Sequence, residues 1–231
     1  MRDLLLFVDT ETSGIPPSMK AAVTDTEKWP FVLQVAWRIH DRSGNLIKIE
    51  NHFIFEPEVS IEKSSFKVHG ISKEDLRVKG EDRKAVMQLF NDDLKRYKPL
   101  VIGHFVELDS KILQVAMRRA GLPNILKDYP HFCTMRATTE YTRFPNHNYP
   151  KLPDLYLGLF GEKMIREHDS AVDAEATARC FFELYRKGEL DEQMIDNQPL
   201  FHRVKEKVRQ NTGCGLPVVM LLIAGLLLSL L

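Results

Sequence analysis

Hydrophobic positions near the start of the chain follow two patterns that predict strands. Leu4–Val8 is a continuous apolar run, which is typical of a buried central strand. In residues 31–39 every second residue is apolar, which is the period of two that predicts a strand. The Asp-Arg-Ser-Gly sequence at 41–44 indicates a hairpin turn. Apolar residues at 47–55 then continue as a returning strand. We therefore expect a three-stranded antiparallel meander.

Helical spacing dominates the rest of the chain up to about residue 187. The predicted elements, in order, are a helix at 86–97, a buried strand at 100–102, a helix at 108–116, a strand at 132–135, and helices at 152–160 and 172–184. Asp169 or Ser170 can cap the last helix. A meander followed by alternating helices and strands predicts an α/β fold with a mixed sheet flanked by helices.

Composition narrows the function classes. The chain has 231 residues, 44% hydrophobic and 28% charged, which is typical of a globular protein. Its 32 basic and 32 acidic residues give a net charge of zero, which argues against tight coating of long duplexes but allows an acidic site that binds cations. The three cysteines are far apart, which argues against a zinc site or a disulfide framework and suits a reducing compartment.

An acidic pair follows the first predicted strand. At a period of two residues, Asp9 and Glu11 point to the same face, where their charges repel unless cations lie between them. Carboxylate oxygens suit Mg²⁺ or Mn²⁺. The alternative is that the Asp-Thr-Glu sequence only ends a strand, with the aspartate capping a turn or helix, and for an isolated pair that alternative is favoured.

Three further residues add to this pair in a fixed order along the chain. Asp109 lies at the start of a predicted helix that follows a buried strand, and His168 and Asp173 flank the start of the last helix. Each is a weak signal alone, because an aspartate in a first helical turn commonly interacts with the helix dipole. Together they favour a metal site at strand ends and helix starts.

These residues lie in three motifs, FVDTETSG, VIGHFVELD and HDSAVDAEAT, supported by HGIS at 69–72 and by KLPDLYLGLFGE at 151–162. In this order the motifs resemble the DEDDh 3′→5′ exonuclease family, whose members similar to the epsilon subunit of DNA polymerase III have an RNase H-like fold. The resemblance covers residues 1–187, which we interpret as an exonuclease domain.

The resemblance implies that Asp9, Glu11, Asp109 and Asp173 bind two Mg²⁺ or Mn²⁺ ions. Glu11 and His168 would be catalytic, with His168 as the general base, since histidine titrates near neutral pH. The substrate would be single-stranded nucleic acid with a free 3′ end, DNA favoured over RNA, and the product a nucleoside 5′-monophosphate. Backbone at Thr10 and Thr12 would contact the terminal nucleotide; His69 either lines this pocket or stabilises a turn.

Two alternatives stay open from the sequence. The first is a non-catalytic nucleic-acid-binding domain of the same fold, which the presence of all five residues disfavours. The second is an enzyme that trims RNA or degrades short oligoribonucleotides. Phe105 and Leu108 also depart from the family, which usually has asparagine after the second motif's histidine and an aromatic residue before its aspartate. We therefore expect altered substrate handling. Trp29 either stacks on a base or anchors its loop.

The last part of the chain differs in character. Residues 216–231 carry no charge and would span about 24 Å as a helix, against about 30 Å for a bilayer core. We interpret them as a candidate transmembrane anchor, with 188–215 as a tether. Basic residues at 203–209 would keep the catalytic domain on the cytoplasmic side. Packing within the protein or in an oligomer is the alternative for this helix.

Overall fold

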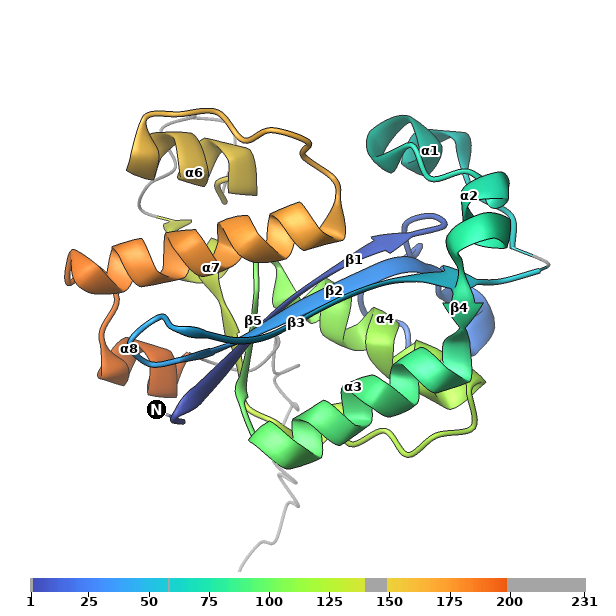
Figure 1. Cartoon of the computed structure of the whole chain (residues 1–231), viewed down its shortest axis with the longest axis horizontal. Coiled ribbons are helices and arrows are strands. Elements are labelled where there is room, and N and C mark those ends of the chain that lie inside the picture. Colours follow the sequence, from blue (N-terminus) through green and yellow to red (C-terminus); the bar gives the residue numbers. More distant parts are fainter. Residues whose placement is uncertain (1, 58, 140–148, 199–231) are drawn as a thin grey trace, which may run out of the picture. The chain divides into compact units, whose positions relative to one another are not determined.

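A mixed sheet forms the centre of the fold (Figure 1). The computed structural model describes residues 2–57, 59–139 and 149–198. Within them, six strands lie in the order β4-β3-β2-β1-β5-β6. The strands are β1 (Leu4–Thr12), β2 (Val32–Asp41), β3 (Leu46–Phe55), β4 (Glu81–Asp82), β5 (Leu100–Gly103) and β6 (His131–Cys133).

The predicted meander and mixed sheet are confirmed. Strands β1, β2 and β3 pair antiparallel, whereas β5 pairs parallel to β1 and β6 parallel to β5. The β2–β3 turn closes through a hydrogen bond of 3.1 Å from the Gly44 amide to the Asp41 carbonyl. Gly44 has φ of 87°, a left-handed conformation that glycine adopts without steric cost. The parallel pairs bring the carboxyl ends of β1, β5 and β6 to one edge.

Helices cover the sheet on both sides (Figure 1). They are α1 (Lys63–His69), α2 (Lys73–Lys79), α3 (Arg83–Tyr97), α4 (Val106–Arg119), α5 (Thr134–Ala137), α6 (Leu152–Phe160), α7 (Ser170–Arg186) and α8 (Glu192–Asn197), with 3₁₀ turns η1 (Thr26–Lys28) and η2 (Leu126–Asp128). Helices α3 and α4 lie on one face, and α7 packs on β1 and β2 from the other.

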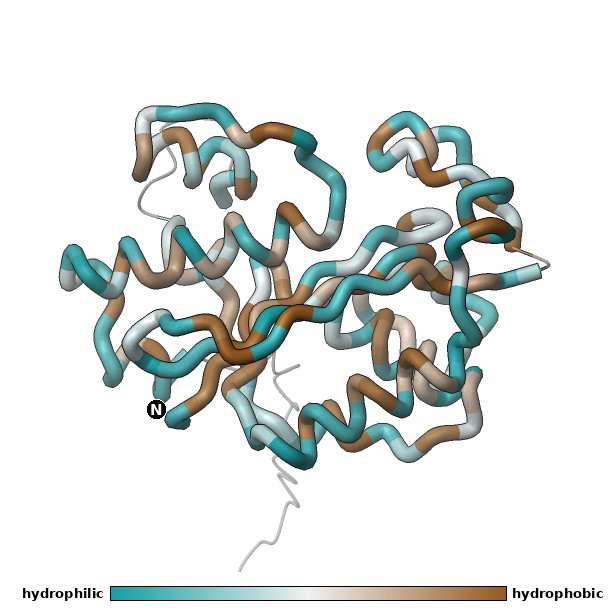
Figure 2. The backbone as a smooth tube through the Cα atoms, viewed as in Figure 1, coloured by the Kyte–Doolittle hydropathy of each residue, from teal (hydrophilic) through white to brown (hydrophobic). Residues whose placement is uncertain are grey.

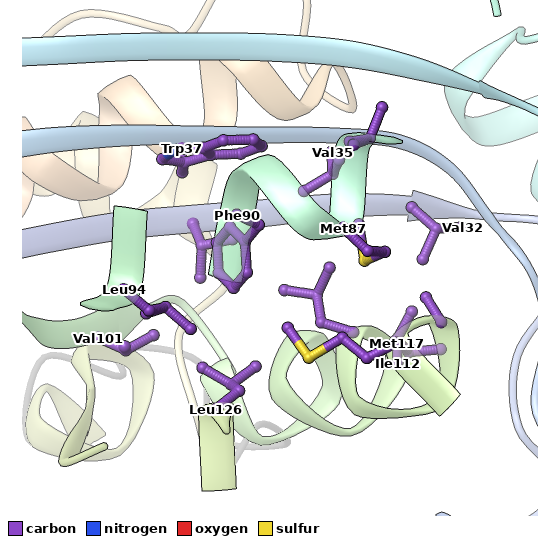
Figure 3. Close-up of a cluster of buried hydrophobic side chains, with 14 of the residues drawn as sticks. Val32, Val35, Trp37, Met87, Phe90, Leu94, Val101, Ile112, Met117 and Leu126 are labelled. Atoms are coloured by element: carbon purple, nitrogen blue, oxygen red, sulfur yellow. The ribbon is translucent and has the colours of Figure 1, made fainter. Parts of the chain in front are cut away.

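The core has two main parts, one on each face of the sheet. Under α3 and α4, Trp37 packs with Phe90, Met87 and Leu94 (Figure 3). Under α7, Phe7 packs with aromatic side chains that include Phe132 and Phe181. Figure 2 shows hydrophobic stretches along the central strands and hydrophilic connections around them. Burial of this apolar surface is the main driving force for the fold.

Side-chain alternation along β1 decides which face receives its acidic residues. Leu6 and Val8 belong to the α3–α4 side of the core, whereas Leu5 and Phe7 belong to the α7 side. Residues two apart share a face, so Asp9 and Glu11 continue the row of Phe7. The sequence of β1 therefore directs both carboxylates toward α7.

The structure adds elements that the sequence pattern did not reveal, namely α1, α2, α5, α8 and the two-residue strand β4. Leu190 and Ile195 are buried in the core under α7, so the folded part extends past residue 187, where we expected the tether to begin. The rest of that tether and the candidate anchor at 216–231 lie outside the described residues. Among the helices that are described, none has the length and apolar character to cross a bilayer.

Candidate functional site

The end of β1 contributes Asp9 and Glu11. Although this segment is polar, β1 continues through it to Thr12 because Asp9 and Glu11 pair in register with Ala36 and Gln34 of β2. Glu11 is only 8% exposed. The strand therefore holds two carboxylates on one face within hydrogen-bonded backbone, which fixes their positions.

Helix α4 contributes Asp109. Strand β5 lies parallel to β1, so α4, which begins directly after β5, starts beside the carboxyl end of β1. Asp109 lies in the first turn of α4 and is buried. The Thr10 hydroxyl donates a hydrogen bond of 2.8 Å to Asp109 Oδ1. This contact joins the strand and the helix at the site.

Helix α7 contributes Asp173, and the segment that leads into α7 contributes His168. The Asp169 side chain caps α7 by accepting from the Ala171 amide at 3.1 Å, which confirms one of the two predicted caps. His168 has φ of 64°, and its amide donates to Asp173 Oδ2 at 3.2 Å. Potential ligand atoms of Glu11, His168 and Asp173 lie within 4.8 Å of one another. We call Asp9, Glu11, Asp109, His168 and Asp173 the carboxylate site.

The carboxylate site concentrates negative charge. Within the described residues, no lysine or arginine forms an ion pair with its four acidic side chains. Burial, and then the charges of Asp109 and Asp173, raise the pKa of Asp9 well above its ordinary value. Burial and neighbouring carboxylates likewise raise the pKa of Glu11 to about 8, and burial is the main cause that raises those of Asp109 and Asp173 to about 7.

A divalent cation fits this arrangement. Asp173 Oδ1 is buried without a hydrogen-bond partner in the described structure, although buried polar atoms are normally satisfied. Carboxylate oxygens suit hard divalent ions such as Mg²⁺ or Mn²⁺. Bound cations would also relieve the repulsion that raises the pKa values of the carboxyl groups.

Gln34 adds a polar contact that the sequence analysis did not single out. Its amide nitrogen donates to Asp169 Oδ1 at 3.2 Å and to Asn51 Oδ1 at 3.0 Å. Gln34 is buried on β2 directly opposite Glu11, and Asp169 is adjacent to His168. The sequence offered one indication of this contact, a glutamine in the middle of the otherwise largely apolar strand predicted at 31–39. The contact links the sheet to the backbone that carries His168.

The three expected substrate-contacting residues have side-chain partners in the structure. Thr10 binds Asp109, and the Thr12 hydroxyl donates to the Gly14 carbonyl at 2.7 Å. His69 Nδ1 accepts from the Ile71 amide at 2.9 Å, so Nε2 carries the proton that is donated to the Thr12 carbonyl at 3.2 Å. His69 therefore stabilises a turn beside the site, as one of the two interpretations expected. Contact of these residues with a nucleotide stays a prediction.

Two other residues from the sequence analysis now have defined surroundings. Phe105 is the N-terminal cap of α4 with φ of 78°, a conformation that asparagine adopts far more readily than phenylalanine. Trp29 is 3% exposed and donates from its ring nitrogen to the Ala22 carbonyl at 3.1 Å. Trp29 thus anchors its loop to the core, and the base-stacking alternative is wrong for the described structure.

Solved structures of similar fold include several structures of exonuclease I. The chain matches an exonuclease I structure with a TM-score of 0.65 and 18% identity over 80% of this chain and 41% of that one. The zinc-bound complex of Escherichia coli exonuclease I with single-stranded DNA gives 0.63 and 18%, over 81% and 41%. The complex of the same enzyme with a dT13 oligonucleotide gives 0.64 and 18%, over 80% and 41%. The chain spans less than half the length of these proteins.

Comparison with curated proteins gives no match. A family model, RNase_T, described as exonuclease, matches residues 6–181, which is more than half of the chain and includes every residue of the carboxylate site. The mixed sheet, the helices on both of its faces and the structural matches agree with this assignment. The chain therefore belongs to the RNase_T exonuclease family, a DEDD-type family of RNase H-like fold.

Proposed function

We propose that the chain is a DEDDh-type enzyme that uses two metal ions to remove nucleotides from the 3′ end of single-stranded nucleic acid. DNA is favoured over RNA, and the products are nucleoside 5′-monophosphates. The observation that carries this proposal is the convergence of Glu11, His168 and Asp173, whose potential ligand atoms lie within 4.8 Å of one another.

Asp9, Glu11, Asp109 and Asp173 would hold the two ions. When bound, Mg²⁺ or Mn²⁺ ions would lower the pKa of the attacking water and neutralise charge on the phosphate. Thr10 would orient the Asp109 carboxylate through its 2.8 Å hydrogen bond. Gln34 would keep Asp169 in place at the start of α7. Positioning of this kind contributes to catalysis because reacting groups need a fixed geometry.

His168 would act as the general base. It is exposed, so water can reach it, and the hydrogen bond from its amide to Asp173 holds its backbone beside the carboxylates. The imidazole would take one proton from water as the new phosphorus–oxygen bond forms. The bond between phosphorus and the 3′ oxygen then breaks, and that oxygen takes a proton from solvent. Histidine suits this role because it titrates near neutral pH.

The preference for single strands has support from the structural matches. Two of them are complexes of exonuclease I with a dA16 or a dT13 oligonucleotide. Those strands are bound by a much longer protein of 18% identity, so their extension to this chain is a proposal. Discrimination of DNA from RNA would depend on contacts near the 2′-hydroxyl.

Digestion of labelled oligonucleotides tests the proposal. Wild-type protein and an Asp9→Ala variant would be compared on 5′-labelled single-stranded DNA, single-stranded RNA, duplex DNA and a dinucleotide, with Mg²⁺, Mn²⁺ or chelator. We expect stepwise shortening of single-stranded DNA that needs both the metal and Asp9. Equal shortening by both proteins, or none by either, would refute the enzymatic proposal. Faster cleavage of RNA or the dinucleotide would favour the oligoribonuclease alternative.

The cellular location is a separate proposal that depends on sequence alone. The uncharged residues 216–231 would insert into a membrane, and the preceding basic residues would face the cytoplasm with the catalytic domain. Extraction of membranes with alkaline carbonate provides the test. The full chain should stay with the membranes, whereas a chain truncated after residue 198 should be soluble. Complete release of the full chain would rule out a spanning anchor.

A further inference from the structure

Helix α1 exposes a face on which cationic and aromatic side chains lie side by side. Lys63, Phe66 and Lys67 are separated by three and four residues, so they are neighbours on one side of the helix. Ser65, which points in nearly the opposite direction, is buried. Phe66 is 46% exposed, although an aromatic side chain usually packs against the core. Helix α1 therefore presents a mixed basic and aromatic surface to solvent.

In the described part of the chain, the lysines of this surface form no ion pair with a carboxylate. Among the residues that the structure describes, no ion pair involves Lys63, Lys67 or Lys73, the first residue of α2. By contrast, two other basic residues of α2 are paired, Arg77 with Glu74 and Lys79 with Asp75. Residues 62–79 carry five basic and three acidic side chains, so this segment is positive in a chain with zero net charge. Such a surface attracts a polyanion.

The same helix ends beside the carboxylate site. His69, its last residue, donates to the carbonyl of Thr12, which directly follows Glu11. In Figure 1, α1 and the start of α7 both lie above the end of β1. A strand whose end lies in the carboxylate site could therefore continue over α1.

We propose that Lys63, Phe66, Lys67 and Lys73, here called the α1 surface, bind the part of the substrate strand that lies 5′ of the bond being cleaved. This inference rests on the proposed function. The lysines would neutralise phosphates, and Phe66 would stack on a base. These are the two contacts that single-stranded nucleic acids offer regardless of sequence. The α1 surface would thus determine preference for long strands without taking part in the chemical step.

Two substrates separate the α1 surface from the carboxylate site. One is a single strand of about 20 nucleotides, long enough for several phosphate contacts beyond the reacting one. The other is the p-nitrophenyl ester of thymidine 5′-monophosphate, which has one phosphate and fills the carboxylate site alone. The test variant is Lys63→Ala/Lys67→Ala/Lys73→Ala. The matched control is Lys84→Ala/Lys98→Ala/Lys127→Ala, three exposed lysines on or near α3 and η2.

The α1 variant should raise KM for the long strand about tenfold, with little change in kcat, because only binding is lost. The slope of log KM against the logarithm of the salt concentration should fall by about 2, since each of the three lost phosphate contacts to a single strand contributes about 0.7 to that slope. Activity on the nitrophenyl ester should equal that of the wild type. The control variant should match the wild type on both substrates, and thermal melting should show that both variants are folded.

Phe66→Ala tests the aromatic contact separately. It should raise KM for the long strand about fivefold or more and leave its salt dependence unchanged, because stacking releases no counterions. The inference is overturned if the α1 variant binds the strand as the control does, or if it loses both substrates equally. It is also overturned if the wild type cleaves only the ester. A wild type that cleaves neither substrate would refute the proposed function itself.

Discussion

Two regions of the molecule bury acidic side chains on opposite faces of the sheet. Under α3, Asp93 is 4% exposed and accepts hydrogen bonds from Trp37 Nε1 at 2.8 Å and Lys48 Nζ at 2.7 Å. Burial alone would lower the pKa of Lys48, but the hydrogen bonds that Lys48 donates to Asp93 and Glu50 outweigh it and raise that pKa. On the α7 face, the carboxylate site brings four acids together, and within the described residues no lysine or arginine forms an ion pair with them.

The difference separates a structural acid from a functional one. An uncompensated buried charge is costly, so a carboxylate that serves only the fold is paired within the protein, as Asp93 is. Within the described residues, the acids of the carboxylate site form no ion pair; burial and then the neighbouring carboxylates raise their pKa values, which makes the metal-free protein less stable than it could be. Strain of this kind is common at sites where binding supplies the missing partner. Substitutions in the two regions should therefore have opposite effects.

The largest effect is expected from Asp9→Asn. Loss of one carboxylate should reduce kcat by about a thousandfold or more, because metal binding contributes several kcal/mol to the transition state. The same substitution should raise the melting temperature of the metal-free protein, since it removes a repulsive charge. Assays of strand cleavage and thermal melting in chelator measure the two effects. A variant that is both inactive and less stable without metal would contradict the comparison.

Asp93→Asn should show the reverse pattern. Weakening the pair with Lys48 should lower the free energy of unfolding by about 2 kcal/mol, less than for a fully buried pair because the Lys48 side chain is 24% exposed. Both kcat and KM should stay close to wild-type values. Urea unfolding and strand-cleavage assays check this prediction. A large loss of activity in a folded Asp93→Asn protein would show that the two regions are not separable.

Gln34→Leu sharpens the boundary between structure and function. The leucine keeps the volume of the side chain but cannot donate to Asp169, so the start of α7 and His168 should lose a fixed position. We expect kcat to fall about tenfold, as for other groups that orient metal-site residues. KM should change little, and Gln88→Leu, on exposed α3 surface, serves as the control. An unchanged kcat would assign Gln34 to the fold alone.

The smallest effect concerns pH. In the metal-free protein, Glu11 has a pKa of about 8 against an ordinary 4.5, and Asp173 has one of about 7 against 3.8. Between the ordinary pKa and the raised pKa of each group, the folded state therefore binds more protons than the unfolded state. The free energy of unfolding should fall as pH rises from about 5 to 8. Mn²⁺ should raise the melting temperature more at the upper end of this range. Equal stabilisation throughout would argue against cation binding by these carboxyl groups.

Much of this arrangement follows from local patterns in the sequence. The strands of the meander, the 41–44 turn and helices α3, α4 and α7 have strong periodicity, and the structure has each of them within a few residues of its predicted bounds. Asp9, Glu11, Asp109 and Asp173 could be selected because they follow buried strands or begin helices. Their roles as metal ligands stay predictions that the geometry supports.

Other features depend on contacts that no local pattern reveals. Helices α1 and α2 have seven residues each and bury few of them, so their periodicity is weak. The hydrogen bonds from Thr10 to Asp109 and from Gln34 to Asp169 join residues 99 and 135 positions apart. Leu190 and Ile195 follow a glycine and were assigned to a tether, but tertiary packing buries them. The pairing of Asp93 with Lys48 likewise exists only once α3 lies on the sheet.

The central claim is that the carboxylate site takes its missing positive charge from divalent cations. Calorimetric titration of Mn²⁺ into the metal-free protein near pH 7, repeated in buffers with different ionisation enthalpies, measures both the binding and the protons released. The account predicts binding with release of protons from the acids whose pKa values are raised, and loss of both in Asp9→Asn but not in Asp93→Asn. The account would be contradicted if Mn²⁺ did not bind. It would also be contradicted if Mn²⁺ bound without releasing protons and bound equally well to Asp9→Asn.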